Sequence, residues 1–171
     1  EDGTAAGYEL SSWGGTVGFD VDLTPRLTMG LAATAMYGNF TAKSADLAEG
    51  DLDTYYVTGF ARYAANRWSH TFVATAGMAD TSLSRTVSHA SGCYSTEGDT
   101  EAISFGFLYE LGYVLAMNES ASACLQPVFS VMLSHSTLDG YTEAGSDAAL
   151  KTGGVDMTTV TFGLGARAQA I

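Results

Sequence analysis

Few residues in this sequence have the types and the spacing that catalytic or metal sites need. His135, Ser136 and Asp139 are the residue types of a hydrolase triad, but residues so close in sequence cannot adopt the Ser–His–Asp geometry. The three histidines have no ligand-like spacing with one another or with the two cysteines. Residues 163–168 resemble a dinucleotide-binding motif, yet no β-α-β pattern surrounds them. We therefore expect no catalytic, metal-binding or cofactor-binding residues. We also expect that the protein is not an enzyme.

Glu110 is the ionisable residue with the most unusual surroundings. Large apolar residues occupy the odd positions from Ile103 to Leu115, and mostly small or polar residues, Glu110 among them, occupy the even positions. Alternation at period two indicates a β-strand, because successive side chains point to opposite faces. A soluble sheet buries its apolar face, whereas a membrane barrel turns that face to lipid and lines its lumen with small or polar side chains. The strand alone does not distinguish a soluble sheet from a membrane barrel, so the rest of the sequence is needed to choose between them.

The same alternation recurs along the chain and predicts seven strands. Helical periodicity is absent, and no apolar run reaches the ~18 residues of a transmembrane helix. Short turns and long polar loops alternate between the strands, so all short turns lie at one end of the predicted sheet and all long loops at the other. The strands are residues 13–23, 27–38, 53–63, 68–78, 103–115, 125–134 and 159–169; the short turns are 24–26, 64–67 and 118–122; the long loops are 41–52, 82–100 and 139–154.

Strand length, facing and loop asymmetry together favour a membrane barrel. The predicted strands have ten to thirteen residues, against ~5–6 in ordinary sheets, and a tilted membrane-spanning strand needs ~9–11. Outer-membrane barrels have short periplasmic turns and longer external loops. The sequence therefore predicts an all-β fold, a transmembrane antiparallel up-and-down β-barrel of which this chain supplies about seven strands.

The two faces of the predicted barrel have different side chains. Glu110, Arg62, Arg167 and Asp20 fall on the lumen face. There they form either a charge cluster, which grips an internal segment or sets pore selectivity, or a solvated wall. Aromatic rings near strand ends suit the headgroup level of a membrane. The predicted lipid-facing and interfacial aromatic residues are Trp13, Phe19, Trp68, Phe105, Phe107, Tyr109, Tyr113, Phe129 and Phe162.

Composition excludes one class of partner. The 171 residues include 7 Lys plus Arg against 19 Asp plus Glu, a formal net charge of −12, whereas nucleic-acid binding needs a basic surface. Two cysteines do not make a disulfide scaffold. Cys93 is expected in a long loop and Cys124 beside a short turn at the opposite end, too far apart for the ~4.4–6.8 Å Cα spacing of a disulfide.

Several segments resemble one protein family. In their order and spacing they are similar to the autotransporter β-domain of type V secretion. They are GGTVGFDVDL (14–23), LTMGLA (27–32), GDLDTYYVTGFARY (50–63), FLYELGY (107–113), LQPVFSV (125–131), GYTEAG (140–145) and FGLGAR (162–167).

That resemblance implies a twelve-stranded outer-membrane barrel with a linker helix threaded through its lumen. Its role would be to anchor a passenger domain and export it to the surface of a Gram-negative-type bacterium, with the long loops extracellular and without covalent chemistry. Its partners would be outer-membrane lipid, its own passenger and linker helix, and the barrel-assembly machinery. Residues 1–171 are similar to the interior of such a domain, without the N-terminal linker helix or first strands and without the closing C-terminal strands.

Two other classes of protein remain open at the level of sequence. One is a different outer-membrane barrel, a porin or an enzyme with a site among its loops, in which acidic residues bind cations or substrate. The other is a soluble β-sandwich or lipocalin-like binding module whose 103–115 apolar face is core. The acidic loop residues of the first alternative are Asp51, Asp53, Glu97, Asp99, Asp139 and Glu143.

Overall fold

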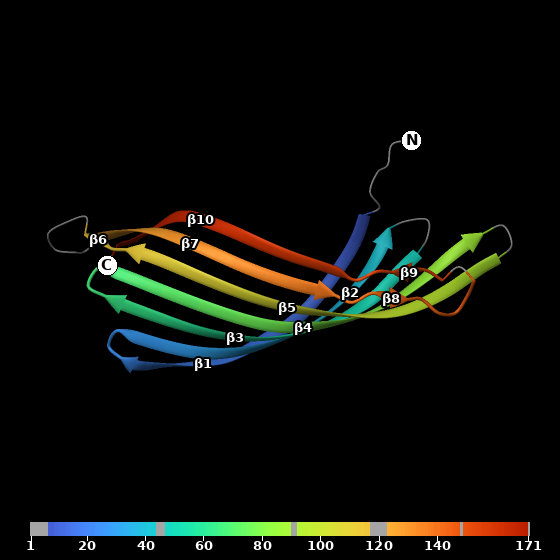
Figure 1. Ribbon diagram of the computed structural model, residues 1–171, viewed down its shortest axis with the longest axis horizontal. Helices are drawn as coiled ribbons and strands as arrows, with labels where there is room; N and C mark the ends of the chain where they lie inside the picture. Colours follow the sequence, from blue (N-terminus) through green and yellow to red (C-terminus); the bar gives the residue numbers. More distant parts are fainter. Residues whose placement is uncertain (1–6, 44–46, 90–91, 117–122, 148, 171) are drawn as a thin grey trace, which may run out of the picture.

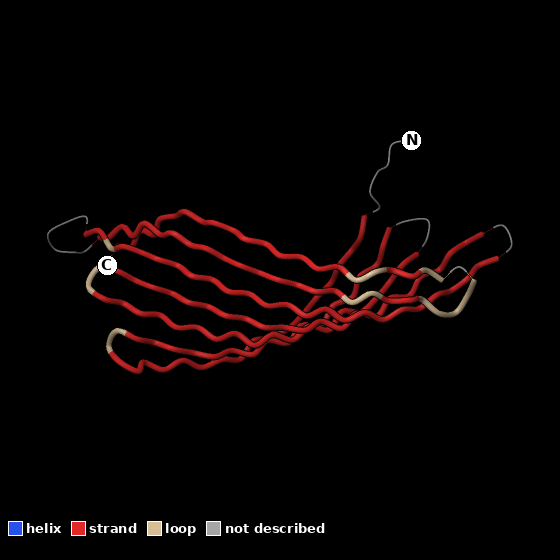
Figure 2. The backbone as a smooth tube through the Cα atoms, in the orientation of Figure 1, coloured by secondary structure: helices blue, strands red, loops and turns tan. Residues whose placement is uncertain are grey.

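The structure, a computed structural model, describes residues 7–43, 47–89, 92–116, 123–147 and 149–170, and nearly all of these are in β-strands (Figures 1 and 2). These residues contain no helix that is long and apolar enough to cross a membrane. The long strands are β1 (Gly7–Thr24), β2 (Leu27–Lys43), β3 (Leu47–Ala65), β4 (Trp68–His89), β5 (Gly92–Tyr113), β7 (Ala123–Leu138) and β10 (Val155–Ala170). The short ones are β6 (Leu115–Ala116), β8 (Tyr141–Thr142) and β9 (Lys151–Thr152).

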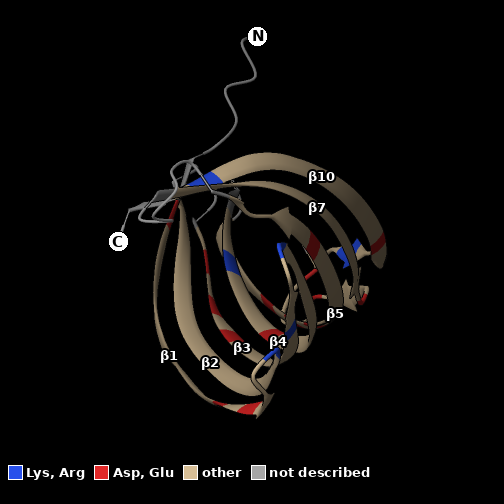
Figure 3. Ribbon diagram, turned by 90° about the vertical axis from the view of Figure 1, so that its left-hand side faces the viewer, with Lys and Arg blue, Asp and Glu red and all other residues tan. Residues whose placement is uncertain are grey.

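The seven long strands form one antiparallel sheet in which each strand pairs with the next along the chain. The order is β1-β2-β3-β4-β5-β7-β10, and β6 continues beside β7 after a break in β5. The sheet curves into an open trough (Figure 3). Among the described strands, β1 and β10 are its two edges. The prediction of an all-β, up-and-down antiparallel fold is confirmed.

The strands are longer than the sequence pattern predicted, with 16 to 22 residues each. The predictions of long loops at 41–52 and 82–100 are wrong, because β2 and β3 extend to within a few residues of each other, as do β4 and β5. A hairpin ladder is held by backbone hydrogen bonds and needs no apolar face, so a polar, acidic sequence can continue a strand. The described residues of the third predicted loop, 139–147 and 149–154, are irregular apart from β8, β9 and the bridge of Ala144 to Glu97.

Two of the predicted short turns are confirmed, and each is a two-residue link. Pro25 and Arg26 join β1 to β2, and Asn66 and Arg67 join β3 to β4. Proline presets the φ angle that such a turn needs. Asn66 has φ 57°, in the left-handed region that asparagine tolerates well. The third predicted turn, 118–122, lies outside the described residues.

The two faces of the sheet differ in character, and we call the face with Phe105 the outer face and the face with Glu110 the inner face. No apolar side chain among the described residues is buried. On the outer face Phe105 is 57% exposed and Phe162 is 71% exposed. A soluble module would have buried these side chains as its core. The structure therefore does not fit the β-sandwich alternative, in which residues 103–115 would supply that core.

Glycines on the inner face leave room for aromatic rings of the neighbouring strand. A Cβ atom at Gly77 would overlap the ring of Tyr56, and one at Gly30 would lie 2.6 Å from Cζ of Phe60. These contacts settle the facing of β3, which has aromatic residues on both faces. Tyr56 and Phe60 cross the inner face, and Tyr55 is exposed on the outer face.

Candidate functional site

An ion pair on the inner face joins two residues that the sequence analysis assigned to the lumen. Arg167 Nη2 donates to Glu110 Oε2 at 2.8 Å. Glu110 of β5 lies in one register row with Ser130 of β7 and Gly163 of β10, so Arg167 reaches back along β10 to meet the carboxylate. The side chain of Glu110 is 17% exposed and that of Arg167 is 60% exposed. Solvent therefore screens this pair, and its net contribution to stability is small.

A polar pocket of about 400 Å³ surrounds the pair. Arg62 of β3 lines this pocket in the same register row as Glu110, with Thr71 of β4 between them. Because adjacent strands are ~4.8 Å apart, the backbones at Arg62 and Glu110 are ~10 Å apart. No ion pair joins Arg62 to another residue in the described part of the chain. The pocket is lined by Arg62, Ser69, Thr71, Leu108, Glu110, Gln126 and Arg167.

The fourth predicted lumen residue, Asp20, is not part of this group. Asp20 lies further along the inner face, in the register row of Gly30. Asp22 instead shares a row with Arg62, and Thr28 between them donates from Oγ1 to Asp22 Oδ1 at 2.5 Å. The alternation puts both aspartates on one face, but it does not give the register between strands. Sequence reasoning missed Asp22 for that reason.

A second polar contact crosses β5 beside the pocket. Gln126 Nε2 of β7 donates to Ser69 Oγ of β4 at 2.6 Å, and it passes over Gly112 of β5. A Cβ atom at Gly112 would lie 2.6 Å from Ser69 Oγ. Only glycine lets two strands that are not neighbours join their side chains here. The inner wall is thus tied together by polar side chains across β5.

Aromatic side chains form two groups at different levels of the outer face. At the short-turn end, the rings of Trp68 and Tyr113 are 4.7 Å apart between centroids. At a level farther from the short turns, the ring centroids of Trp13 and Tyr37 are 5.0 Å apart, and the ring of Tyr55 is edge-on to that of Tyr37. Such groups are typical of membrane interfaces. The alternation of their strands puts the other predicted aromatic residues on the same face: Phe19, Phe105, Phe107, Tyr109, Phe129 and Phe162.

The spacing of the two aromatic groups fits an apolar band of membrane height. Trp68 and Met78, which lie at the two levels, are ten residues apart in β4, or ~33 Å along the strand at ~3.3 Å per residue. Barrel strands tilt by ~35–45°, and the apolar band of an outer-membrane barrel is ~25 Å tall. Directly beyond Met78 the outer face becomes acidic, because Asp53, Asp80 and Glu101 lie in one row on three adjacent strands.

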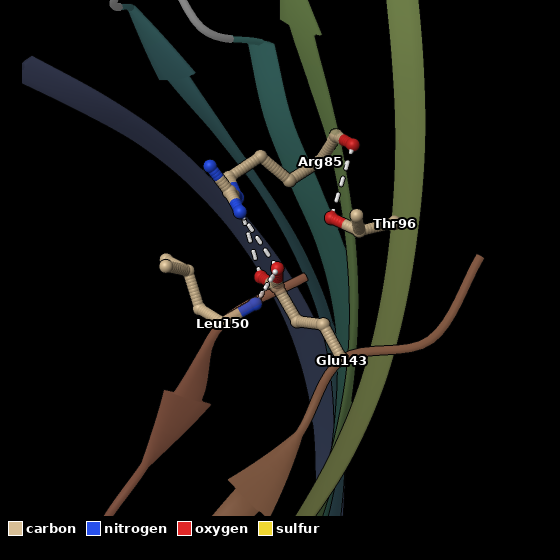
Figure 4. Close-up of polar contacts among 4 residues, drawn as sticks. All are labelled: Arg85, Thr96, Glu143 and Leu150. Carbon is tan, nitrogen blue, oxygen red and sulfur yellow. Dashed lines mark hydrogen bonds and ion pairs between the residues drawn. The ribbon is translucent and has the colours of Figure 1, made fainter. Parts of the chain in front are cut away.

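A second polar site lies at the other end of the inner face, where the connection between β7 and β10 meets β4 (Figure 4). Arg85 Nη2 and Nε donate to the two carboxylate oxygens of Glu143 at 2.7 and 3.2 Å, a bidentate arrangement. The N–H of Leu150 donates to Glu143 Oε2 at 3.0 Å, and Thr96 Oγ1 donates to the carbonyl oxygen of Arg85 at 3.4 Å. We call these contacts the Arg85–Glu143 clasp. The Glu143 side chain is only 2% exposed.

The clasp favours the ionised form of Glu143. Hydrogen bonds from the Arg85 guanidinium lower the pKa of Glu143 from 4.5 to about 2, and the N–H of Leu150 acts in the same direction. Burial acts against them, since desolvation disfavours a carboxylate. A buried carboxylate of this kind depends on its partners, because removing one of them leaves an uncompensated charge. Sequence reasoning missed this partner because it placed Arg85 in a loop.

The backbone around the clasp also pairs with β5. The N–H of Ala144 donates to the carbonyl oxygen of Glu97 at 2.8 Å, and the N–H of Glu97 donates to the carbonyl oxygen of Ala144 at 3.0 Å. At Gly98 a Cβ atom would lie 2.7 Å from Cδ2 of Tyr141. Gly145 has φ 112°, which favours glycine. The connection is therefore folded back against β5.

The described histidine and cysteine side chains do not gather into one site. His135 Nδ1 is 2.8 Å from Thr158 Oγ1, on the neighbouring strand. The register places Cys93 and Cys124 at opposite ends of the sheet, as predicted. In the described part of the chain, no group of three or more His, Cys, Asp or Glu side chains could hold a metal ion. The acidic residues of the loop-site alternative thus form no such group there.

Long antiparallel strands with an apolar outer face, two aromatic levels and a polar inner wall define the wall of an outer-membrane β-barrel. Solved structures have the same fold. The translocator domain of autotransporter NalP from Neisseria meningitidis matches with a TM-score of 0.79 and 15% identity, over 97% of this chain and 56% of that chain. The ferric yersiniabactin uptake receptor FyuA from Yersinia pestis matches with a TM-score of 0.63 and 11% identity, over 95% of this chain and 27% of that chain.

The chain belongs to the autotransporter beta-domain family, which it matches over residues 1–170. It therefore belongs to an outer-membrane autotransporter protein, as expected from the sequence. It is 32% identical over 165 residues to an uncharacterized protein in the trpE-trpG intergenic region of Pseudomonas putida, covering 95% of this chain and 27% of that protein. It is 31% identical over 98 residues to esterase EstA of Pseudomonas aeruginosa, covering 57% of this chain and 15% of that protein. The chain thus spans less than a third of these relatives.

Proposed function

We propose that this chain forms part of the wall of a barrel through which a passenger domain of the same polypeptide reaches the cell surface. The observation that carries this proposal is the inversion of the two faces, with exposed apolar side chains outside and the Glu110–Arg167 pair in a polar pocket inside. An apolar outer face is stable in lipid, whereas a polar inner wall is stable around a hydrated path. Membership of the family supports both the passenger and the outer membrane of a Gram-negative bacterium.

We further propose that the inner wall holds an internal segment of the polypeptide. Arg62 lines the pocket without an ion pair to any described residue, so it is available to a carboxylate or to the carbonyl end of a helix. Beside it, Glu110 offers an acceptor and Arg167 offers a donor. A segment with complementary charges would fit this wall. The plain alternative is a solvated wall without an occupant.

The orientation and the edges of the sheet form a third part of the proposal. The end with the β4–β5 extension and the β7–β10 connection would face outside, and the two-residue turns would face the periplasm. Unpaired backbone groups cost several kcal/mol each in lipid, so β1 and β10 would pair with further strands of a larger barrel. The family implies that barrel-assembly machinery inserts it.

Covalent chemistry is not part of the proposed role of this chain. EstA is named an esterase, but the region of similarity is 15% of its length. We propose that the similarity reflects a shared transport domain. Hydrolysis of short-chain esters by the purified barrel domain would contradict this part of the proposal.

Charge reversal at Glu110 tests the role of the inner wall. Glu110→Lys puts a third cation beside Arg62 and Arg167, and because solvent screens these partly exposed side chains the repulsion costs ~1 kcal/mol. We expect surface display of the passenger to fall roughly fivefold or more, measured by protease accessibility on whole cells. Heat-dependent gel migration reports barrel assembly in the same samples.

The double variant Glu110→Lys with Arg167→Glu restores one opposite-charge pair and should recover part of the display. If Glu110→Lys alone assembles and displays the passenger as the wild type does, the wall is only solvated and holds no segment. That result leaves the translocator role intact. A wild-type protein that assembles and displays no passenger contradicts the translocator role itself.

A further inference from the structure

The connection between β7 and β10 folds over the inner face of the sheet. Arg85 of β4 and Gly98 of β5 are at positions whose side chains lie on the same face as Glu110. Glu143 contacts the first (Figure 4). Tyr141 packs against the second, so both residues reach this face from the connection. In Figure 1, β8 and β9 lie beside the ends of β4 and β5 that are far from the two-residue turns. The connection thus lies against the inner face of β4 and β5, at the end of the sheet that is far from the two-residue turns.

The clasp is the strongest of the contacts that hold this connection. Most other described side chains of the connection are exposed, and its apolar residue Leu150 is 53% exposed, so no apolar core holds it. The other contacts are the backbone pair of Ala144 with Glu97 and the packing of Tyr141 on Gly98. A bidentate, charge-assisted contact away from water is stronger than either.

We propose that the β7–β10 connection is a cap over the external end of the path and that the Arg85–Glu143 clasp keeps it closed. The cap has two arrangements: closed, with Glu143 held by Arg85 and Leu150, or open, with both charges in water. This inference rests on the proposed function only in taking the inner face as the path of the passenger. Closure itself follows from the contacts of Glu143 and can be measured separately from export.

Trypsin cleavage after Lys151 measures the open arrangement. Lys151 pairs with Thr142 in the β8–β9 hairpin, next to Leu150, whose N–H binds Glu143. A protease cuts such a segment only when it opens locally, and the cleavage rate follows the open population. On intact cells with the full-length protein, Glu143→Gln is expected to raise the rate of cleavage after Lys151 roughly tenfold or more.

Two further variants make the comparison specific. Asp147→Asn removes the same charge from the same connection, at an exposed position outside the clasp, and is expected to leave the rate unchanged. Glu143→Asp keeps the charge but is one methylene shorter, so it cannot reach Arg85 and Leu150 together and should give an intermediate rate. Heat-dependent gel migration is measured for every variant to confirm that the barrel has assembled.

The cap is disproved if assembled Glu143→Gln is cut no faster than the wild type, or if Asp147→Asn is cut as fast as Glu143→Gln. If Glu143→Gln does not assemble, Glu143→Asp provides the test instead. A wild-type cleavage rate in Glu143→Asp then overturns the proposal. Failure of the proposed function has a different signature. The wild-type protein would then assemble with a trypsin-resistant connection and display no passenger.

Discussion

Gly77→Ala is expected to destabilise the folded barrel by about 1–3 kcal/mol, the usual range for overpacking a well-packed site. A Cβ atom at this position would overlap the ring of Tyr56 and lie 2.9 Å from the carbonyl oxygen of Tyr55. The ring would have to move to make room, and the carbonyl oxygen belongs to the backbone of the adjacent strand. The midpoint of urea unfolding and the fraction of heat-resistant barrel on gels should therefore both fall.

Gly15→Ala is the matched control, because the space around its Cβ position is empty to 4 Å among the described residues. It should leave both readouts at the wild-type level. Gly77→Ala combined with Tyr56→Ala should recover part of the loss seen for Gly77→Ala, since the ring overlap disappears and the contact with the carbonyl oxygen remains. Equal effects of Gly77→Ala and Gly15→Ala would show that the glycine–aromatic packing does not matter for stability.

The faces of the strands could be predicted from the sequence because alternation depends only on local geometry. Each residue of a strand points opposite to its neighbours, so the separation of Glu110 from Phe105 and Phe107 follows from counting. The same reasoning could not settle β3, where Tyr55 and Tyr56 are both aromatic. Its facing depends on Gly77 in the next strand, which leaves room for one ring and not the other.

The ends of the strands and the contacts between distant segments could not be predicted in this way. Residues 82–89 are polar and look like a loop, yet they extend β4 because their backbone groups pair with β5. Arg85 and Glu143 are 58 positions apart in sequence, and their contact requires both this extension and an inward fold of the β7–β10 connection. The choice between Asp20 and Asp22 likewise depends on strand register. Alternation gives facing, but it does not give register.

Acid is expected to open the cap only well below the ordinary pKa of a glutamate. The pKa of Glu143 is lowered from 4.5 to about 2 in the folded protein, so the stability that its ionised form contributes is complete above pH 4.5. It is lost as the pH falls from there through about 2, because the carboxylate then takes up a proton and releases Arg85.

Hydrogen exchange at the amide of Leu150, compared between the wild type and Glu143→Gln, measures this opening. The intrinsic pH dependence of exchange cancels in the ratio of the two rates. The wild type should be more protected by a constant factor from pH 7 down to about 4.5, and that factor should shrink towards one as the pH approaches 2. A ratio that is small at neutral pH and reaches one just below pH 4.5 would mean that the pKa of Glu143 is lowered only slightly and that Arg85 holds it weakly. A ratio of one at neutral pH would remove the clasp altogether, whereas a ratio above one that stays constant down to pH 2 would mean that protonation of Glu143 is not linked to opening, and would contradict the lowered pKa.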